Sequence, residues 1–203
     1  MPRAAFAATD FVAAARAIAR DGGPGAITVA AVSERLGAPT GSFYHRFASR
    51  DALAGELWLS LVLAFQEGFL AAADMGDWLG AVLHVPAWSR LHPADARLVA
   101  AHRKEDFLRE GEWTPEFRRR VRNQAEAIKS RLDRFAREVL GGTDPDRLRR
   151  AQFVLLDAPL AAVRPHLIAG EAPPPVVDVL LREIFQALTP HHARGPGQHQ
   201  PPI

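Results

Sequence analysis

Apolar residues along the 203-residue chain recur at helical spacing, and no segment alternates with the two-residue period of a strand. One buried face, carrying Phe11, Ala14 and Ile18, predicts a helix over residues 4–20, and the Gly- and Pro-rich run at 21–25 ends it. Further helices are expected over residues 51–73, 78–91, 93–109, 115–140, 146–169 and 175–188. The pattern therefore predicts an all-α protein.

Two short helices joined by a tight turn are expected within residues 27–53. The first has apolar residues at helical spacing, and Thr28 stands at its N-cap position. Gly37 is expected to end it, because glycine takes a positive φ at no steric cost. The second begins near Thr40 and combines one apolar face with small polar, aromatic and basic side chains. Such a short helix is typical of proteins that read the major groove of DNA, so the segment predicts a DNA-binding transcriptional regulator.

The same stretch resembles the signature of the TetR family of transcriptional regulators, roughly G-x-S-x-G-T-x-Y-x-H-F-x-x-K-x-x-L. The residues that follow it are Gly37, Gly41, Tyr44, Phe47, Arg50 and Leu53. Three positions depart from it: Pro39 replaces the usual Ser, Arg46 the usual His and Arg50 the usual Lys. The resemblance, which covers residues 6–57, implies a three-helix helix-turn-helix domain followed by a larger helical domain for ligand binding and dimerisation.

On this basis we expect the DNA-binding domain at residues 1–50 and the effector-binding and dimerisation domain at 51–189. The tail at 190–203 is rich in His, Gly, Pro and Gln and is expected to be disordered. The first 50 residues carry six Arg against three acidic residues, a net charge of +3, and the rest of the chain carries −1. This asymmetry fits a DNA reader on a near-neutral body, although ordinary scatter of surface charge explains it equally well.

The resemblance also implies which residues contact DNA. The residues expected to contact base edges are Thr40, Ser42 and His45, and Gly41 is small enough to let the backbone approach the groove. The residues expected to bind DNA phosphates are Tyr44, Arg46 and Arg50, together with Thr28, which also caps its helix. The expected partner is a double-stranded, pseudo-palindromic operator.

A small-molecule effector and a homodimer complete what the resemblance implies. The candidate pocket residues are Phe65, Phe69, His84, Trp88, Trp113 and Phe117, each of which is alternatively an ordinary core residue. The candidate dimer contacts on the last two long helices are Leu155, Leu160, Val163, Leu167, Leu181, Ile184 and Phe185. Apolar stripes of this kind are alternatively buried inside one subunit. A hydrophobic or aromatic effector is slightly favoured over a highly charged one.

Other function classes have less support. The chain has no cysteine, no run approaching the ~20 apolar residues of a membrane helix, no secretory pattern and no metal-ligand spacing. We therefore expect a cytoplasmic protein without metal or cofactor. No nucleophile elbow or phosphate-binding glycine loop favours an enzyme. The interpretation is a homodimeric repressor that an effector releases from DNA, with an activator or a helical DNA-binding protein without ligand control as alternatives.

Overall fold

The computed structural model describes residues 6–108 and 113–189, and every regular element in these ranges is helical. The N-terminal elements are α1 (Ala8–Gly22), the short η1 (Pro24–Ala26), α2 (Val29–Leu36) and α3 (Thr40–Tyr44). The body contains α4 (Arg50–Asp74), α5 (Trp78–Leu91), α6 (Pro93–Ala101), α7 (Lys104–Phe107), α8 (Pro115–Val139), α9 (Pro145–Gln152), η2 (Phe153–Asp157), α10 (Ala158–Ala169) and α11 (Val176–Leu188). The all-α prediction is confirmed for the described residues.

The capping residues expected from the sequence set the ends of α2. The Thr28 Oγ1 accepts a hydrogen bond from the Ala31 N–H at 3.1 Å and so satisfies one of the free donors of the first turn. Gly37 ends the helix in the left-handed region, with φ 61° and ψ 26°, a conformation that costs other residues more. The chain is thereby turned sharply from α2 into α3.

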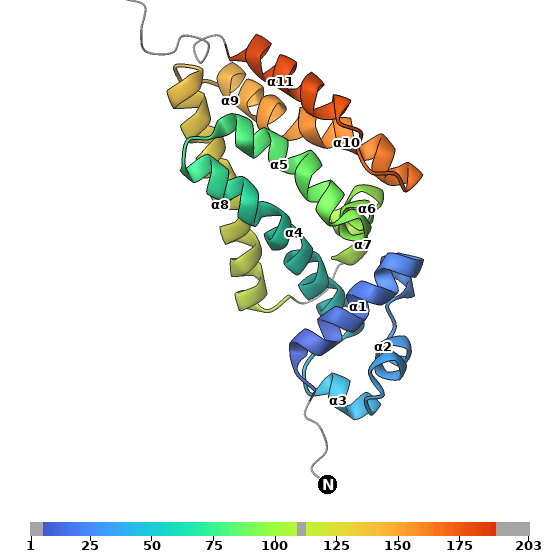
Figure 1. The fold of residues 1–203 in the computed structure, drawn as a ribbon. Helices are drawn as coiled ribbons and strands as arrows, with labels where there is room; N and C mark the ends of the chain where they lie inside the picture. Colours follow the sequence, from blue (N-terminus) through green and yellow to red (C-terminus); the bar gives the residue numbers. More distant parts are fainter. Residues whose placement is uncertain (1–5, 109–112, 190–203) are drawn as a thin grey trace, which may run out of the picture.

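Helix α4 joins the N-terminal unit, defined here as α1–α3, to the body (Figure 1). It begins where the Ser49 Oγ accepts a hydrogen bond from the Ala52 N–H at 3.1 Å. By length and composition alone α4 would suffice to cross a membrane. However, α4 packs against α1, α5 and α8, and its Leu53, Leu57 and Phe69 are fully buried. These contacts identify it as the central core helix of the fold.

Two hydrophobic cores lie along α4. The first joins α1, α3 and the first half of α4, and at its centre the Phe11 ring meets the rings of Phe43 and Phe47 edge-on, at centroid distances of 5.9 and 6.0 Å. The second fills the body between α4, α5, α8 and the C-terminal helices. Helices α10 and α11 lie side by side on its outer edge (Figure 1) and pack on α5.

One expected helix has a break inside it, and another contains an irregular turn. The helix expected over 93–109 is broken at His102 and Arg103, whose backbones are extended, and α7 restarts after the Arg103 N–H bonds the Asp106 carboxylate. The C-terminal helix expected from residue 146 contains the π-helical turn η2 just before Pro159. A proline ring clashes with the carbonyl four residues earlier in a regular helix, and a wider turn relieves that clash.

Candidate nucleic-acid interface and the α1–α8 cleft

Helix α3 presents a polar face outward because its apolar face is anchored in the N-terminal core. Phe43 is completely buried, whereas the next residue, Tyr44, is 58% exposed. The Tyr44 ring packs edge-on against the Phe43 ring, with centroids 5.3 Å apart, so its position is fixed while its hydroxyl remains accessible. Thr40, Gly41 and His45 are also exposed, and Ser42 is half-buried. The arrangement places hydroxyl, phenol and imidazole groups on one short helix at the surface.

Arg46 and Arg50 lie differently from the other predicted DNA contacts. The Arg46 Nε donates a hydrogen bond to the Phe6 carbonyl at 3.1 Å, which directs this side chain toward the start of α1. The Arg50 guanidinium donates to the carbonyls of Ile27, at 2.8 Å, and Pro24, and to the Asp51 carboxylate at 2.7 Å. Only 20% of the Arg50 side chain is exposed. Arg50 therefore ties the start of α4 to the segment before α2.

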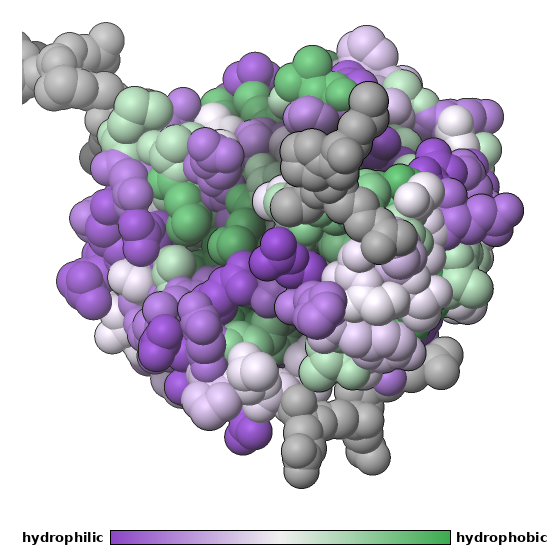
Figure 2. Space-filling model, turned by 90° about the horizontal axis from the view of Figure 1, so that it is seen from below, coloured by the Kyte–Doolittle hydropathy of each residue, from purple (hydrophilic) through white to green (hydrophobic). Residues whose placement is uncertain are grey.

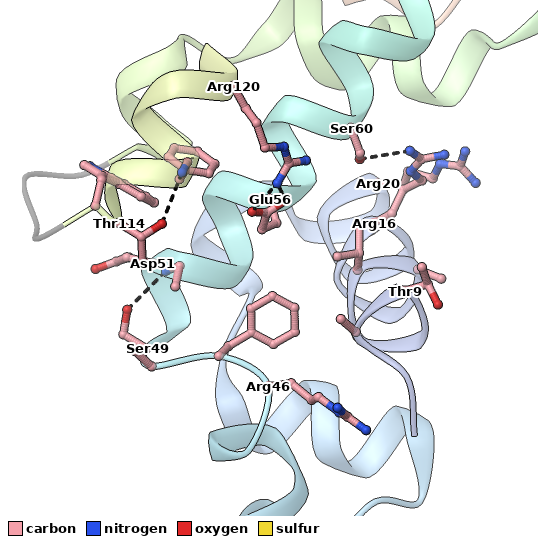
Figure 3. Close-up of a pocket in the computed structure, with 18 residues that line it drawn as sticks. Thr9, Arg16, Arg20, Arg46, Ser49, Asp51, Glu56, Ser60, Thr114 and Arg120 are labelled. Atoms are coloured by element: carbon pink, nitrogen blue, oxygen red, sulfur yellow. Dashed lines mark hydrogen bonds and ion pairs between the residues drawn. The ribbon is translucent and has the colours of Figure 1, made fainter. Parts of the chain in front are cut away.

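A cleft of about 930 Å³ separates the N-terminal unit from the body, and we call it the α1–α8 cleft (Figure 3). Its walls are α1, the α3–α4 connection, the first half of α4 and the start of α8. Seen from the end that carries the N-terminal unit, the molecule is hollowed, with hydrophobic side chains on the floor of the hollow and hydrophilic ones around it (Figure 2). The volume of the α1–α8 cleft lies within the range typical of small-molecule sites.

An aromatic pair forms one wall of this cleft. The rings of Trp113 and Phe117 are stacked, with centroids 4.6 Å apart and an interplanar angle of 24°. The Trp113 ring lies directly on the backbone of α4 at Gly55, where an added Cβ would come within 2.5 Å of it. Thr114, between the two aromatic residues, caps α8 by accepting a hydrogen bond from the Phe117 N–H at 3.1 Å. The cap and the missing side chain of Gly55 together fix the aromatic wall.

Charged groups from α1 form the opposite wall. The Arg16 Nη2 donates to the Ser60 Oγ of α4 at 3.1 Å, and its Nη1 lies 3.8 Å from the Asp95 carboxylate of α6. Arg20 binds the same carboxylate through its Nε at 2.9 Å and its Nη2 at 2.8 Å. Asp95 is only 5% exposed. The two arginines thus connect the N-terminal unit to two helices of the body.

Comparison with known proteins identifies the N-terminal unit. Residues 11–57 match the family model of bacterial regulatory proteins of the tetR family. The matched segment covers α1–α3 and the start of α4, which includes the capped helix-turn-helix and the exposed face of α3.

Residues 11–57 therefore form a DNA-binding domain of the TetR type. The match supports a DNA-binding regulator, and regulators of this family are generally not enzymes.

A solved structure of similar fold also covers the body. The transcriptional regulator FadR from Bacillus subtilis, crystallised in complex with stearoyl-CoA, is similar to this chain with a TM-score of 0.55. The similarity covers 89% of this chain and 97% of that chain, at 13% sequence identity. At this identity the comparison establishes the shared all-α fold. No curated protein sequence matched the chain.

The structure sorts the predicted DNA contacts into two groups. Six of them are at the surface of the helix-turn-helix: Thr28, Thr40, Gly41, Ser42, Tyr44 and His45. Arg46 and Arg50 are instead bonded to the protein's own backbone in the DNA-free chain, and their phosphate contacts stay predictions. The sequence motif located both arginines, but it contained no information about the carbonyl groups that the folded chain places beside them.

The predicted pocket residues are also divided. Trp113 and Phe117 line the α1–α8 cleft. Phe69 and Trp88 are buried in the body core, and the Phe65 ring packs against the rings of His84 and Trp88 at centroid distances of 5.6 and 5.3 Å. Phe65, Phe69, His84 and Trp88 belong to the packing of α4 on α5 and do not line this cleft, and their role in effector binding stays a prediction.

Most of the predicted dimer contacts are buried within the subunit. The residues of that set with 5% exposure or less are Leu155, Val163, Leu167, Leu181 and Phe185. Ile184 is half-buried, and Leu160 alone of the set is exposed, at 44%. This matches the alternative of an apolar stripe buried inside one subunit, because an amphipathic pattern predicts a buried face but not the surface that buries it. The dimer contacts of these residues stay a prediction.

Sequence analysis missed the residues of the charged wall. Arg16 and Arg20 stand four residues apart in an otherwise Ala-rich helix, a spacing that places both on one face. That spacing was the available signal. Their partners, Ser60 and Asp95, are 44 and 75 residues away along the chain from Arg16 and Arg20, respectively, and nothing local in the sequence connects them.

Proposed function

We propose that this TetR-family protein is a cytoplasmic homodimeric repressor that a small-molecule effector releases from a pseudo-palindromic operator. The proposal keeps the division into a DNA-binding domain at residues 1–50 and an effector-binding and dimerisation domain at 51–189. The observation that carries it is the exposed Tyr44 beside the buried Phe43, which supports a rigid α3 with a free polar face. The tail at 190–203 lies outside the described residues.

In this proposal α3 enters the major groove of one operator half-site. Thr40, Ser42 and His45 read base edges, since hydroxyl and imidazole groups donate and accept hydrogen bonds there. Tyr44 and Thr28 bind phosphates, which fix the register of the head on the duplex without reading its sequence. The N-cap role of Thr28 is compatible with this contact, because its hydroxyl hydrogen is not used in accepting from Ala31.

We place the dimer interface on the outer face of α10 and α11. The large apolar side chains exposed there are Leu160, Ile168, Val176, Val179 and Leu180, each between 44% and 55% exposed. Pairing two such faces in a four-helix arrangement would bury them. Leu180→Glu should therefore reduce the solution mass from that of a dimer to that of one subunit, measured by light scattering. Leu63→Glu on α4, where Leu63 is 43% exposed, is the matched control and should leave the mass unchanged.

An effector releases DNA only if it binds the DNA-free conformation more tightly than the DNA-bound one. The α1–α8 cleft supports such a mechanism, because one wall belongs to the N-terminal unit and the other to the body. The FadR structure of similar fold contains stearoyl-CoA. We therefore include acyl-CoA thioesters among the effector classes to be screened.

The test begins with selection of bound fragments from the source genome, followed by duplex binding with random competitor DNA. Tyr44→Ala should weaken operator binding by roughly ten- to a hundredfold for each head, because a hydrogen bond to a charged group contributes about 1.5–3 kcal/mol. Met75→Ala, a change at an exposed residue at the end of α4, is the control and should bind as the wild type does. Equal, weak binding of both proteins to selected and random duplexes would contradict the proposal.

Two other outcomes would support an alternative function. Tight binding without preference for the selected fragments would support the alternative of a DNA-binding protein without sequence choice. Sequence-specific binding that raises transcription from a reporter would indicate an activator.

A further inference from the structure

We propose that the α1–α8 cleft binds an amphipathic carboxylate, with its anionic group at Arg16 and its apolar part against Trp113 and Phe117. The inference concerns a site and a ligand class, and its link to operator release rests on the function proposed above. It follows from the placement of an aromatic wall opposite a cationic wall across one cleft of about 930 Å³.

The aromatic wall is built to receive an apolar group. The stacked rings of Trp113 and Phe117 are held by the Thr114 cap and by contact with Gly55. Trp113 is half-buried in spite of its size, so part of its ring faces the cleft. Covering this surface with a hydrocarbon chain or an aromatic ring removes apolar area from water, which is worth roughly 25 cal/mol per Å² before the costs of binding are subtracted.

The cationic wall has an unused donor. The Arg16 Nε is buried and has no hydrogen-bond partner among the described residues. A buried N–H without a partner is costly, and a carboxylate oxygen that reached it would remove that cost with a charge-assisted bond. The Ser60 hydroxyl, which Arg16 Nη2 contacts, donates to the Leu57 carbonyl at 2.7 Å. Arg16 is therefore held in place before any ligand binds.

The balance of charge in the cleft favours an anionic ligand. Glu56 is neutralised by Arg120, which donates to both carboxylate oxygens at 2.8 and 2.9 Å. Arg16 and Arg20 share the one carboxylate of Asp95, which leaves this cluster with one uncompensated positive charge. Figure 3 shows these groups around the same opening, with Arg16 and Arg20 on one side and Thr114 on the other. A neutral ligand would leave this excess positive charge unpaired.

Occupancy of this site would act directly on the contact between the two parts of the molecule. A carboxylate at Arg16 would weaken the 3.8 Å ion pair between the Arg16 guanidinium and Asp95 of α6, whereas Arg20 would keep its two shorter contacts with Asp95. Ligand binding would therefore weaken the α1–α6 link while bridging α1 to α8. Because linkage is reciprocal, operator DNA must then lower the affinity for the ligand by the same factor by which the ligand lowers the affinity for DNA.

The first experiment measures binding of decanoate and phenylbutyrate to the full chain by calorimetry, with decanol and phenylbutanol as neutral analogues of matched size. We expect each carboxylate to bind at least tenfold more tightly than its alcohol. Arg16→Gln should remove this preference, and Trp113→Ala should weaken acid and alcohol alike. Arg119→Gln, at an exposed residue of α8 outside the cleft lining, makes the same change of charge and should bind as the wild type does.

A second variant, Ala13→Glu, tests the site independently of whether Arg16→Gln folds. Ala13 is exposed and lines the cleft, so Ala13→Glu is tolerated by the helix and places a competing carboxylate three residues from Arg16. It should lower carboxylate affinity at least tenfold without affecting the alcohols. Absence of saturable binding by both acids, or equal acid affinity in wild type and both variants, would overturn the site.

The same samples separate this inference from the proposed function. Operator binding without ligand tests the DNA reader alone, and carboxylate binding without DNA tests the site alone. If the carboxylates bind at Arg16 but leave operator affinity unchanged, the site is supported and release by this ligand class is refuted. If operator binding is specific but no carboxylate binds, the DNA-binding proposal stands and the ligand site is refuted.

Discussion

Arg50 offers the sharpest test of a structural role against a DNA-binding one. Its guanidinium satisfies the carbonyls of Pro24 and Ile27, both buried, at the point where α4 leaves the N-terminal unit. Arg50→Ala would remove this donor from both carbonyls; the Pro24 carbonyl would keep the hydrogen bond from the Ile27 N–H at 3.3 Å, whereas the Ile27 carbonyl would lose its side-chain donor. A buried polar group that loses its partner costs about 1–3 kcal/mol, and the half-exposed contact with Asp51 adds at most about 1 kcal/mol. We therefore expect the free energy of unfolding to fall by about 3 kcal/mol.

The assay is thermal and urea unfolding of the full chain followed by circular dichroism. For a chain of this size each kcal/mol moves the midpoint by about 2–4 °C, so a drop of roughly 6–12 °C is expected. Arg50→Lys is the informative comparison. A lysine keeps the charge but not the planar fork that reaches two carbonyls, so it should recover only part of the stability.

A phosphate contact at Arg50 would give a different result. Arg50→Ala would then leave the unfolding midpoint unchanged and reduce the slope of log affinity against log salt by about 0.9 for each head. Arg50→Lys would restore that slope, because a lysine also neutralises a phosphate. An unchanged midpoint with a reduced slope would refute the structural role assigned here.

Three further predictions concern packing and titration. Gly55→Ala should destabilise the fold by about 1–2 kcal/mol in urea unfolding, because overpacking against Trp113 outweighs the gain in helix propensity. The control is Gly25→Ala, whose added Cβ meets nothing within 4 Å and should be close to neutral. Equal effects of the two substitutions would contradict the contact between Gly55 and Trp113. Burial is the main reason that the pKa of His84 lies below 6.5, with a smaller opposing effect from its bond to the Phe65 carbonyl. As the pH falls, His84 is protonated at a higher pH in the unfolded chain than in the folded chain, so the free energy of unfolding should fall between about pH 8 and pH 5. His84→Gln should reduce this pH dependence in unfolding measured across that range. The hydrogen bond from Arg131 lowers the pKa of Asp74 below 3.8, so Asp74→Asn should be less stable than the wild type at neutral pH, and the difference should vanish as acid protonates the carboxyl; a constant difference would argue against the ion pair.

Local sequence determined much of the N-terminal unit. Thr28 and Gly37 fixed the ends of α2 through interactions that span only a few residues, a side-chain cap and a left-handed glycine. The spacing of Phe43 and Phe47 placed both rings in the core and left Tyr44 outside. The TetR signature was visible for the same reason: helix ends, turn and apolar spacing are all encoded over short distances.

Only the tertiary structure decided what each helix face contacts. The stripe through Leu155 and Leu181 is apolar enough for a dimer interface, yet it packs on α5 of the same subunit. Arg50 stands at a phosphate-binding position of the sequence signature, and in the folded chain its guanidinium donates a hydrogen bond to the Ile27 carbonyl. Arg16 and Trp113 face one cleft although 97 positions separate them. Periodicity specifies that a face is buried or polar, whereas its partner is set by how distant helices pack, and that depends on the whole chain at once.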